Sequence, residues 1–219
     1  MGLDRMREMV GRLDLESPAE QVVTVAGTNG KGSTVIAMES LLLSAGMAVL
    51  SSISPHVKRF NERIRINGEE ASDLDICSAF QSIDEARLLD REIPLTYFEY
   101  SALASLYLAK MKQVNVAIFE IGLGGRLDAF NVIDAHSAVI TSIGYDHMEF
   151  LGNNLDSIGR EKAGILRPDQ RVVLGPDMPE SVTQCCDKLE LVPRTYGEDF
   201  VADSSTLSQR WNLKGDSYY

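Results

Sequence analysis

Val22-Val23-Thr24-Val25-Ala26-Gly27-Thr28-Asn29-Gly30-Lys31-Gly32-Ser33-Thr34 is the stretch that decides the fold of this chain. It begins with β-branched, apolar residues, continues with a glycine-rich segment, and leads into an apolar pattern with helical spacing. Because β-branched runs favour strands and glycines favour turns, this order predicts a strand over 21–26, a loop, and a helix over 33–45.

The predicted loop has the composition of a phosphate-binding loop. Glycines allow backbone N–H groups to converge on an anion, and the start of a helix adds partial positive charge. Lys31 would supply a full charge, and Ser33 a hydroxyl for Mg²⁺ or a phosphate oxygen. The spacing is shorter than in the general pattern, since only two residues separate Gly27 from Gly30. An ordinary glycine-rich turn is the alternative, but such a turn does not require a lysine at its centre.

Composition limits the classes of protein to which the chain can belong. Its 219 residues are 44% hydrophobic and 24% charged, which suits one globular domain with a sizeable core. A net charge of −11 argues against a nucleic-acid partner outside a local phosphate site. There is no secretory signal and no apolar run long enough for a bilayer. The three cysteines form no disulfide or zinc pattern, so we expect a cytoplasmic protein with no membrane partner.

Strand-like and helix-like segments alternate along most of the chain. Several predicted strands are apolar throughout, which is typical of strands buried on both faces of a parallel sheet. The sequence therefore predicts a doubly wound, mostly parallel α/β sheet flanked by helices. The other predicted helices span 2–15, 72–89, 97–111, 157–166 and 179–190, and the other strands span 49–53, 63–66, 114–121, 138–143, 171–174 and 192–196. The polar tail 200–219 is predicted as a possible hairpin after a domain over 1–199.

The polar residues that carry chemistry follow the predicted strands. Lys31 and Ser33 come after the first strand, Ser54 after the second, Glu120 at the end of the apolar run 114–121, and His147 after strand 138–143. In a parallel sheet these residues share one edge, where hard oxygen ligands suit Mg²⁺. Each has a structural alternative: Ser54 as a turn cap, Glu120 as half of a buried ion pair, and His147 as a hydrogen-bonded structural histidine.

Two further polar positions have simple structural explanations. Thr96 and Glu99 form a capping box at the start of helix 97–111, which explains both without any function. Lys162, inside a predicted helix, would by default be a solvated side chain.

Several strings in the chain together resemble one known family. Ala26 to Thr34 resembles the phosphate loop of the Mur ligase superfamily, and its Lys-Gly-Ser order is similar to that of the folate branch, the dihydrofolate synthase/folylpolyglutamate synthase family. Other matching strings appear in the family's order: Ser54-Pro55-His56, Arg59 to Gly68, Thr96 to Glu99, Glu120 to Asp128, Asp146-His147 and Arg160 to Ile165. The resemblance runs from Gly2 to about Pro179 and implies a fold of the Mur ligase central-domain type.

The resemblance implies roles for individual residues. ATP phosphates would be held by Asn29, Gly30, Lys31, Gly32 and Ser33. One Mg²⁺ would be bound by Ser54 and Glu120 and a second by His147, while Lys162 is similar to a lysine that family members carbamoylate. The pterin substrate would contact Thr96, Leu127, Asp128 and Ala129. The expected catalytic residues are therefore Lys31, Lys162 and His147.

The implied reaction is ATP-dependent ligation of L-glutamate to dihydropteroate or tetrahydrofolate through an acyl phosphate, carried out by a monomer. The family also has a C-terminal glutamate-ligase domain, and this chain ends at Tyr219, where that domain would begin. One alternative is therefore a truncated nucleotide-binding half that binds Mg-ATP without ligase activity. A second is a cell-wall Mur ligase domain, whose loops generally lack the Lys-Gly-Ser and Ser-Pro-His combination.

Overall fold

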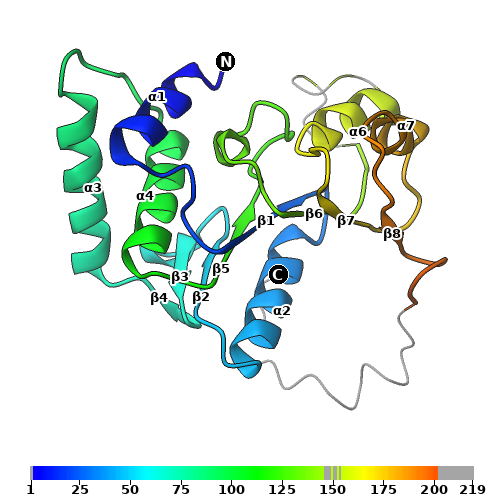
Figure 1. Cartoon of the computed structure of the whole chain (residues 1–219), viewed down its shortest axis with the longest axis horizontal. Helices are drawn as coiled ribbons and strands as arrows, with labels where there is room; N and C mark the ends of the chain where they lie inside the picture. Colours follow the sequence, from blue (N-terminus) through cyan, green and yellow to red (C-terminus); the bar gives the residue numbers. More distant parts are fainter. Residues whose placement is uncertain (1, 146–148, 150–151, 153, 202–219) are drawn as a thin grey trace.

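A single mixed sheet forms the centre of the molecule in the computed structural model, which describes residues 2–145, 149, 152 and 154–201. Within these residues the sheet has eight strands in the order β4-β3-β2-β5-β1-β6-β7-β8 (Figure 1). All neighbouring pairs are parallel except those of β3 with β2 and β4. The strands are β1 (Gln21–Ala26), β2 (Val49–Ser52), β3 (Ile64–Ile66), β4 (Glu69–Glu70), β5 (Val116–Glu120), β6 (Ser137–Ile140), β7 (Arg171–Leu174) and β8 (Arg194–Thr195). The expected mostly parallel α/β sheet is thus confirmed.

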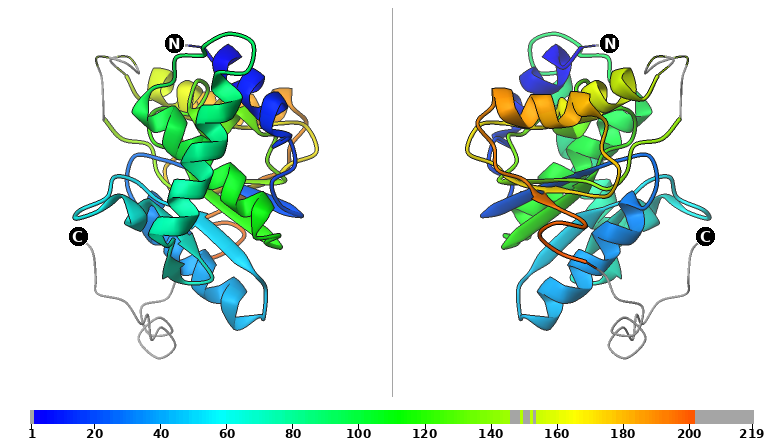
Figure 2. Two further views of the ribbon diagram at one scale, coloured as in Figure 1. Left: turned by 90° about the vertical axis from the view of Figure 1, so that its left-hand side faces the viewer. Right: turned by 90° about the vertical axis from the view of Figure 1, so that its right-hand side faces the viewer.

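Helices cover both faces of the sheet, but unequally. One face carries α1 (Asp4–Leu13), α3 (Asp73–Arg87), α4 (Tyr97–Met111), α6 (Leu155–Ala163) and α7 (Glu180–Lys188). The opposite face carries α2 (Lys31–Ser44), the helix that follows the glycine-rich loop. The side views separate α2 from α3 and α4 on one hand and from α6 and α7 on the other (Figure 2). Two short 3₁₀ helices, η1 (Phe60–Arg63) and η2 (Ala129–Val132), complete the described elements.

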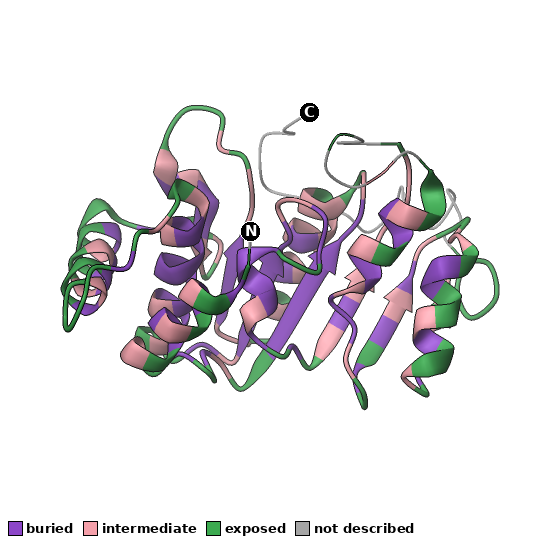
Figure 3. Ribbon diagram, turned by 90° about the horizontal axis from the view of Figure 1, so that it is seen from above, coloured by how far each residue is buried: buried purple, intermediate pink, exposed green. Residues whose placement is uncertain are grey.

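Alternate residues of the central strands enter two separate cores. On β5, Ala117 and Phe119 belong to the large core under the five helices, whereas Val116 and Ile118 belong to the small core under α2. The central strands are therefore buried along most of their length, as Figure 3 shows. This burial on both faces explains why the segment reads as an uninterrupted apolar run.

The predicted element boundaries agree closely with the structure and differ for local reasons. Helix α2 begins at Lys31 rather than residue 33, because Gly30 adopts a left-handed conformation and is its N-cap. Helix α4 has the predicted bounds, and most of its middle is buried because it contacts both the sheet and the outer helices α1 and α3. The predicted hairpin falls, apart from its first two residues, outside the described part of the chain.

A buried ionic cluster joins α2 to the antiparallel edge of the sheet. Glu39 of α2 is 3% exposed and accepts hydrogen bonds from Ser51 of β2 and from Nε of Arg65 of β3. A buried carboxylate is costly unless it is paired and hydrogen-bonded, and Glu39 has both kinds of partner. The cluster therefore fixes the helix of the glycine-rich loop relative to β2.

The strand order places a ligand crevice at one edge of the sheet. β1 lies between β5 and β6, and the chain leaves β1 towards β2 on one side and later adds β6 on the other. Ligands in such sheets bind beyond the carboxyl ends of the strands, where the order reverses. Val25 pairs with Glu120 and Ala26 with Ile140, so the ends of β1, β5 and β6 are level. Within the described residues, none of the helices combines the length and apolar character that crossing a bilayer requires.

Candidate functional site

The loop between β1 and α2 has a conformation that depends on two glycines. Gly27 has φ +150° and Gly30 has φ +82°, in the region that disfavours side chains. A Cβ at Gly27 would lie 1.9 Å from Oγ1 of Thr141, so the loop packs directly on the segment after β6. No side chain caps the start of α2, because its N-cap is Gly30. The first N–H groups of α2 are thus free of a protein cap and suited to an anion.

The segment after β6 braces the loop through backbone and hydroxyl groups. The N–H of Thr28 donates to the carbonyl of Ser142 at 2.8 Å, and the N–H of Asn29 donates to the hydroxyl of Ser142 at 3.0 Å. The hydroxyl of Thr28 accepts from the N–H of Gly144 at 2.9 Å. The sequence analysis did not identify Thr141, Ser142 or Gly144. The sequence signal that could have identified this segment is the pair of hydroxyl residues Thr141 and Ser142 directly after an apolar strand.

Two lysines converge on this loop. Nζ of Lys31 donates to the carbonyls of Gly27 and Thr28 at 3.1 and 3.2 Å. Nζ of Lys162, on α6, donates to the same Gly27 carbonyl at 2.9 Å. The structure therefore overturns the default expectation that Lys162 is solvated, since this side chain is buried and only 3% exposed.

The carboxylate of Glu120 lies beside the first turn of α2. It is 5% exposed, and Oε2 accepts a hydrogen bond from the backbone N–H of Ser54 at 2.8 Å. A Cβ at Gly32 would lie 3.6 Å from Oε2 of Glu120, so helix start and carboxylate are in contact distance. Burial raises the pKa of Glu120, while the Ser54 N–H and the charge of Lys31 act in the opposite direction. Glu120 and Lys31 thus lie on the same side of the sheet.

The residues expected to hold a metal are only partly within the described chain. Ser54 and Glu120 are joined by the hydrogen bond above, whereas His147 lies outside the described residues. No group of three or more His, Cys, Asp or Glu side chains that could hold a metal occurs in the described part. Mg²⁺ commonly takes one or two carboxylates and completes its shell with water and phosphate oxygens. The hydroxyl of Ser54 and the carboxylate of Glu120 fit an ion shared with a nucleotide rather than an ion enclosed by protein.

Asp128 uses its carboxylate to shape the loop after β5. Oδ2 accepts from the N–H groups of Gly122 and Leu123 at 2.9 and 3.2 Å, and Oδ1 accepts from Phe130 at 3.0 Å. The side chain is 5% exposed, and burial raises its pKa to about 6 against these hydrogen bonds. Leu127 beside it is 40% exposed, and Ala129 is buried.

The loop after β5 is also held against α6. A Cβ at Gly125 would lie 2.6 Å from the carbonyl of Glu161, and the guanidinium of Arg126 pairs with the carboxylate of Glu161 at 2.9 Å. This contact fixes the part of α6 that carries Lys162 next to the loop of Asp128. Two regions that are about 35 residues apart in sequence therefore form one wall of the crevice.

Thr96 caps α4, as the sequence predicts. Its hydroxyl accepts from the N–H of Glu99, and the carboxylate of Glu99 accepts from the N–H of Thr96 at 2.7 Å. Glu99 also pairs with Arg5 of α1 at 3.0 Å. Phe98, two residues beyond Thr96, packs edge-on against Phe130 with ring centroids 6.0 Å apart. The start of α4 is thus tied to the loop that carries Asp128.

Comparison with known proteins assigns this arrangement to a family. A model of the Mur ligase middle domain matches residues 25–210, so the chain belongs to the Mur ligase middle-domain family. Its relatives within that family are dihydrofolate synthase/folylpolyglutamate synthases, which confirms the resemblance seen in the sequence. One such enzyme, from Haemophilus influenzae, is 41% identical over 215 residues, covering 98% of this chain and 48% of the relative.

Solved structures of the same enzymes have the same fold. E. coli FolC in complex with DHPP and ADP has 42% identity and a TM-score of 0.87, covering 93% of this chain and 49% of that one. The bifunctional enzyme from Yersinia pestis, complexed with AMPPNP and Mn ion, has 44% identity and a TM-score of 0.85, covering 90% of this chain and 48% of that one. This chain therefore spans about half the length of the relatives that it matches.

Proposed function

We propose that this chain is the nucleotide-binding half of an ATP-dependent ligase that joins L-glutamate to a dihydropteroate or folate acid. The observation that carries the proposal is the convergence of Lys31 and Lys162 on the carbonyl of Gly27, with the carboxylate of Glu120 beside the start of α2. Cations, unpaired helix N–H groups and a carboxylate at one sheet edge are what a magnesium-bound triphosphate requires.

In this proposal the chain binds and aligns phosphates rather than reacting covalently. The N–H groups of residues 30–33 and the ammonium of Lys31 surround the outer phosphates, with the side chain of Asn29 beside them, because the N–H of Asn29 already donates to Ser142. Lys162 supports the loop through the carbonyl of Gly27. A divalent cation between Ser54 and Glu120 would neutralise charge on the transferred phosphoryl group. The second metal position at His147 belongs to the same proposal. So does carbamoylation of Lys162, which would replace its positive charge by a carbamate for a metal ion and leave one N–H for the carbonyl of Gly27.

The chemistry has two steps. A carboxylate oxygen of the acid substrate attacks the γ-phosphorus of ATP, which forms an acyl phosphate and releases ADP. The amino nitrogen of L-glutamate then attacks the acyl carbon, so that the C–N bond forms, phosphate leaves and the nitrogen loses a proton. Charge stabilisation by preorganised groups is the main contribution a protein makes to such transfers. Thr96, Leu127, Asp128 and Ala129 are the proposed contacts of the pterin.

A second candidate is binding of Mg-ATP without ligation by this chain alone. It is favoured by the length of the chain, which is about half that of its relatives. Titration calorimetry with Mg-AMPPNP and a glutamate-dependent phosphate-release assay separate the two. Nucleotide binding with glutamate-dependent release supports the ligase, binding without release supports the second candidate, and no nucleotide binding contradicts both.

We further propose that the protein acts as a monomer in the cytoplasm. The described cysteines, Cys77, Cys185 and Cys186, are free thiols, which suits a reducing compartment. Light scattering coupled to size-exclusion chromatography measures the mass, and a dimer mass would contradict the proposal.

A further inference from the structure

Arg63 is the one buried arginine among the residues that the structure describes. It is 9% exposed, and it forms no ion pair with an acidic side chain in the described part of the chain. Other arginines of the molecule pair with carboxylates, for example Arg59 with Glu70 and Arg65 with Glu39. Nη1 and Nη2 of Arg63 are not among the buried side-chain atoms that lack a hydrogen-bond partner, so they reach solvent. A mostly buried guanidinium whose terminal nitrogens remain open is suited to an anion that comes with a ligand.

Two neighbours hold the guanidinium of Arg63 in place without neutralising it. Its Nε donates to Nδ1 of His56 at 2.7 Å. Its Cζ lies over the ring of Tyr97, 5.3 Å from the centroid. A cation over an aromatic ring is stabilised without losing its charge. Of the donors of the guanidinium, only Nε has a hydrogen-bond partner among the residues that the structure describes.

Arg63 lies at the same sheet edge as the proposed metal site. Its backbone carbonyl accepts from the N–H of Ile53 at 3.0 Å, directly before Ser54. A carboxylate bound at Arg63 would therefore lie at the mouth of the crevice that holds Ser54 and Glu120. This is where a carboxylate has to be if it is to attack a nucleotide phosphate.

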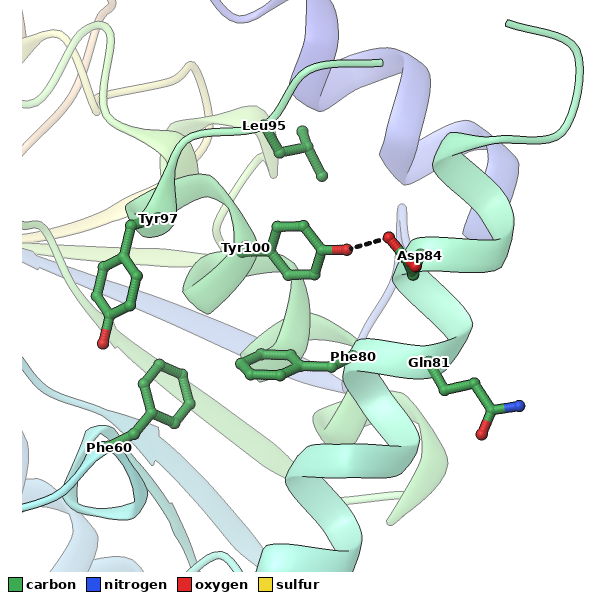
Figure 4. Close-up of a pocket in the computed structure, with 7 residues that line it drawn as sticks. All are labelled: Phe60, Phe80, Gln81, Asp84, Leu95, Tyr97 and Tyr100. Carbon is green, nitrogen blue, oxygen red and sulfur yellow. Dashed lines mark hydrogen bonds between the residues drawn. The ribbon is translucent and has the colours of Figure 1, made fainter. Parts of the chain in front are cut away.

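An aromatic hollow adjoins Arg63 and fits a flat ligand. It has a volume of about 640 Å³, and its wall contains Phe60, Phe80, Leu95, Tyr97 and Tyr100 (Figure 4). The rings of Phe60 and Tyr97 meet edge to face with centroids 6.0 Å apart. Volumes of this size and such apolar walls are typical of pockets for small organic ligands.

The two ends of the hollow differ in charge. Its far wall on α3 carries Asp84, which accepts hydrogen bonds from Arg87 and from the hydroxyl of Tyr100 at 2.6 and 2.9 Å. These hydrogen bonds lower the pKa of Asp84 and keep it ionised. The carboxylate of Asp84 at the α3 end is thus paired with Arg87, whereas Arg63 has no acidic partner in the described residues, so a negative ligand group is attracted to the Arg63 end.

We infer that Arg63 binds the carboxylate of an aromatic acid whose ring packs against Tyr97 and Phe60. The inference rests on the proposed function and assigns to it a positioning residue for the acid substrate. L-glutamate also has carboxylates, but an aliphatic amino acid makes no use of the aromatic wall. The aromatic acid is therefore the ligand to which the geometry points.

The test compares a charged and an uncharged ligand of the same shape. Pteroic acid and its methyl ester are titrated into the 219-residue chain and into Arg63→Met, with binding followed by ligand fluorescence. The wild-type chain should bind the acid roughly 10- to 100-fold more tightly than the ester, as expected for a charge-assisted contact. Arg63→Met should bind both equally, with ester affinity unchanged. A wild-type chain without preference for the acid, or a variant that keeps the preference, overturns the inference.

Two control variants separate the guanidinium from general charge and folding effects. Arg59→Met removes a neighbouring charge that is exposed and paired with Glu70, and it should keep the acid preference. Arg63→Lys keeps a point charge but loses the two-pronged geometry, and it should lower the preference. If Arg63→Met also loses ester binding, Arg63→Gln, which keeps a polar side chain without the charge, decides: a lowered acid-to-ester ratio supports the inference, and an unchanged ratio overturns it.

Further titrations show whether Arg63 binds L-glutamate or pteroic acid. They also separate the role of Arg63 from the proposed function. If Arg63→Met weakens binding of L-glutamate but not the preference for pteroic acid, the guanidinium serves the amino acid and the inference is overturned. Mg-AMPPNP binding by the wild-type chain reports on the proposed function alone. Its absence contradicts that function, whereas its presence without an acid preference contradicts only the role of Arg63.

Discussion

Lys31 and Lys162 donate to the same atom, the carbonyl oxygen of Gly27, at 3.1 and 2.9 Å. The two contacts differ in kind. Lys31 lies four residues from Gly27, and its contact can exchange for a ligand phosphate within the loop. Lys162 lies 135 residues away and is buried, so its contact joins α6 to the loop as part of the fold. The two lysines should therefore affect different measurements when they are removed.

Replacing Lys31 should impair nucleotide binding and leave the fold intact. The variant Lys31→Ala removes a half-buried ammonium whose protein partners are two loop carbonyls. We expect the affinity for Mg-AMPPNP to fall roughly 10- to 100-fold, the range of one charge-assisted phosphate contact, with glutamate-dependent turnover abolished. Calorimetric titration measures the change, and Lys188→Ala on the exposed side of α7 is the control that should bind normally. Unchanged affinity in Lys31→Ala would contradict the role of this lysine.

Replacing Lys162 should lower stability, whether or not nucleotide is present. Lys162→Met keeps the length of the side chain but removes the donor to Gly27 within a buried environment. We expect the free energy of unfolding to fall by about 1–3 kcal/mol, because a buried carbonyl loses a donor. Urea denaturation of Lys162→Met and Lys31→Ala, side by side, tests the distinction. Equal losses of stability in the two variants would show that the contacts do not differ as described.

Elements were predicted best where the local residue pattern and the position in the fold favour the same structure. Strands β1 and β7 occupy the predicted residues, because each is an apolar run bounded by polar or turn-forming residues. Helix α4 begins where the Thr96 capping box places it. The glycine-rich loop was identified because its function constrains consecutive residues.

Contacts between distant segments were not predictable from a single sequence. Nothing near Asp128 indicates that its carboxylate accepts three backbone hydrogen bonds. The hydroxyl pair Thr141-Ser142 after an apolar strand marks a polar position, but it does not indicate that Ser142 accepts a hydrogen bond from Asn29. Arg63 was part of a recognised string, yet only the fold shows that it is buried, that it donates to His56, and that it has no acidic partner within the described part of the chain. Such features depend on which surfaces meet, and local propensity contains no information about that.

Adding a methyl group to Gly27 should disrupt the loop more than adding one to another glycine of positive φ. The Cβ of Gly27→Ala would lie 1.9 Å from Oγ1 of Thr141, whereas a Cβ at Gly46, with φ +79°, meets nothing within 4 Å. Gly46→Ala should cost about 1 kcal/mol from backbone strain alone, and Gly27→Ala clearly more. Thermal unfolding measures both, and the double variant Gly27→Ala/Thr141→Ala should recover part of the loss. No recovery in the double variant would count against the Thr141 clash as the cause.

Asp128 should make stability depend on pH in the acidic range. Burial raises its pKa from 3.8 to about 6, so the folded state holds this proton more tightly than the unfolded state. Stability contributed by Asp128 is therefore highest at low pH and falls as the pH rises from about 4 to about 6, by at most about 3 kcal/mol. Urea denaturation across pH 4 to 7, compared with Asp128→Asn, isolates this contribution. A wild-type stability that rises relative to that of Asp128→Asn as the pH increases from 4 to 7 would contradict the assigned environment of Asp128.

Glu120 should show a conflict between stability and metal binding. Its pKa is raised by burial, so at neutral pH the ionised carboxylate costs the folded state free energy that the unfolded state does not lose. Glu120→Gln removes the charge and keeps an oxygen that can accept the N–H of Ser54, so the free protein should unfold at an equal or higher temperature.

The same variant should lose the Mg²⁺ dependence of AMPPNP affinity, because a neutral amide is a weaker ligand for a hard cation. Differential scanning calorimetry and nucleotide titrations with and without Mg²⁺ give the two readouts, with Glu85→Gln on exposed α3 as the control. A destabilised Glu120→Gln with normal Mg²⁺ dependence would indicate a purely structural carboxylate, whereas a stable variant without that dependence would assign the metal to Glu120.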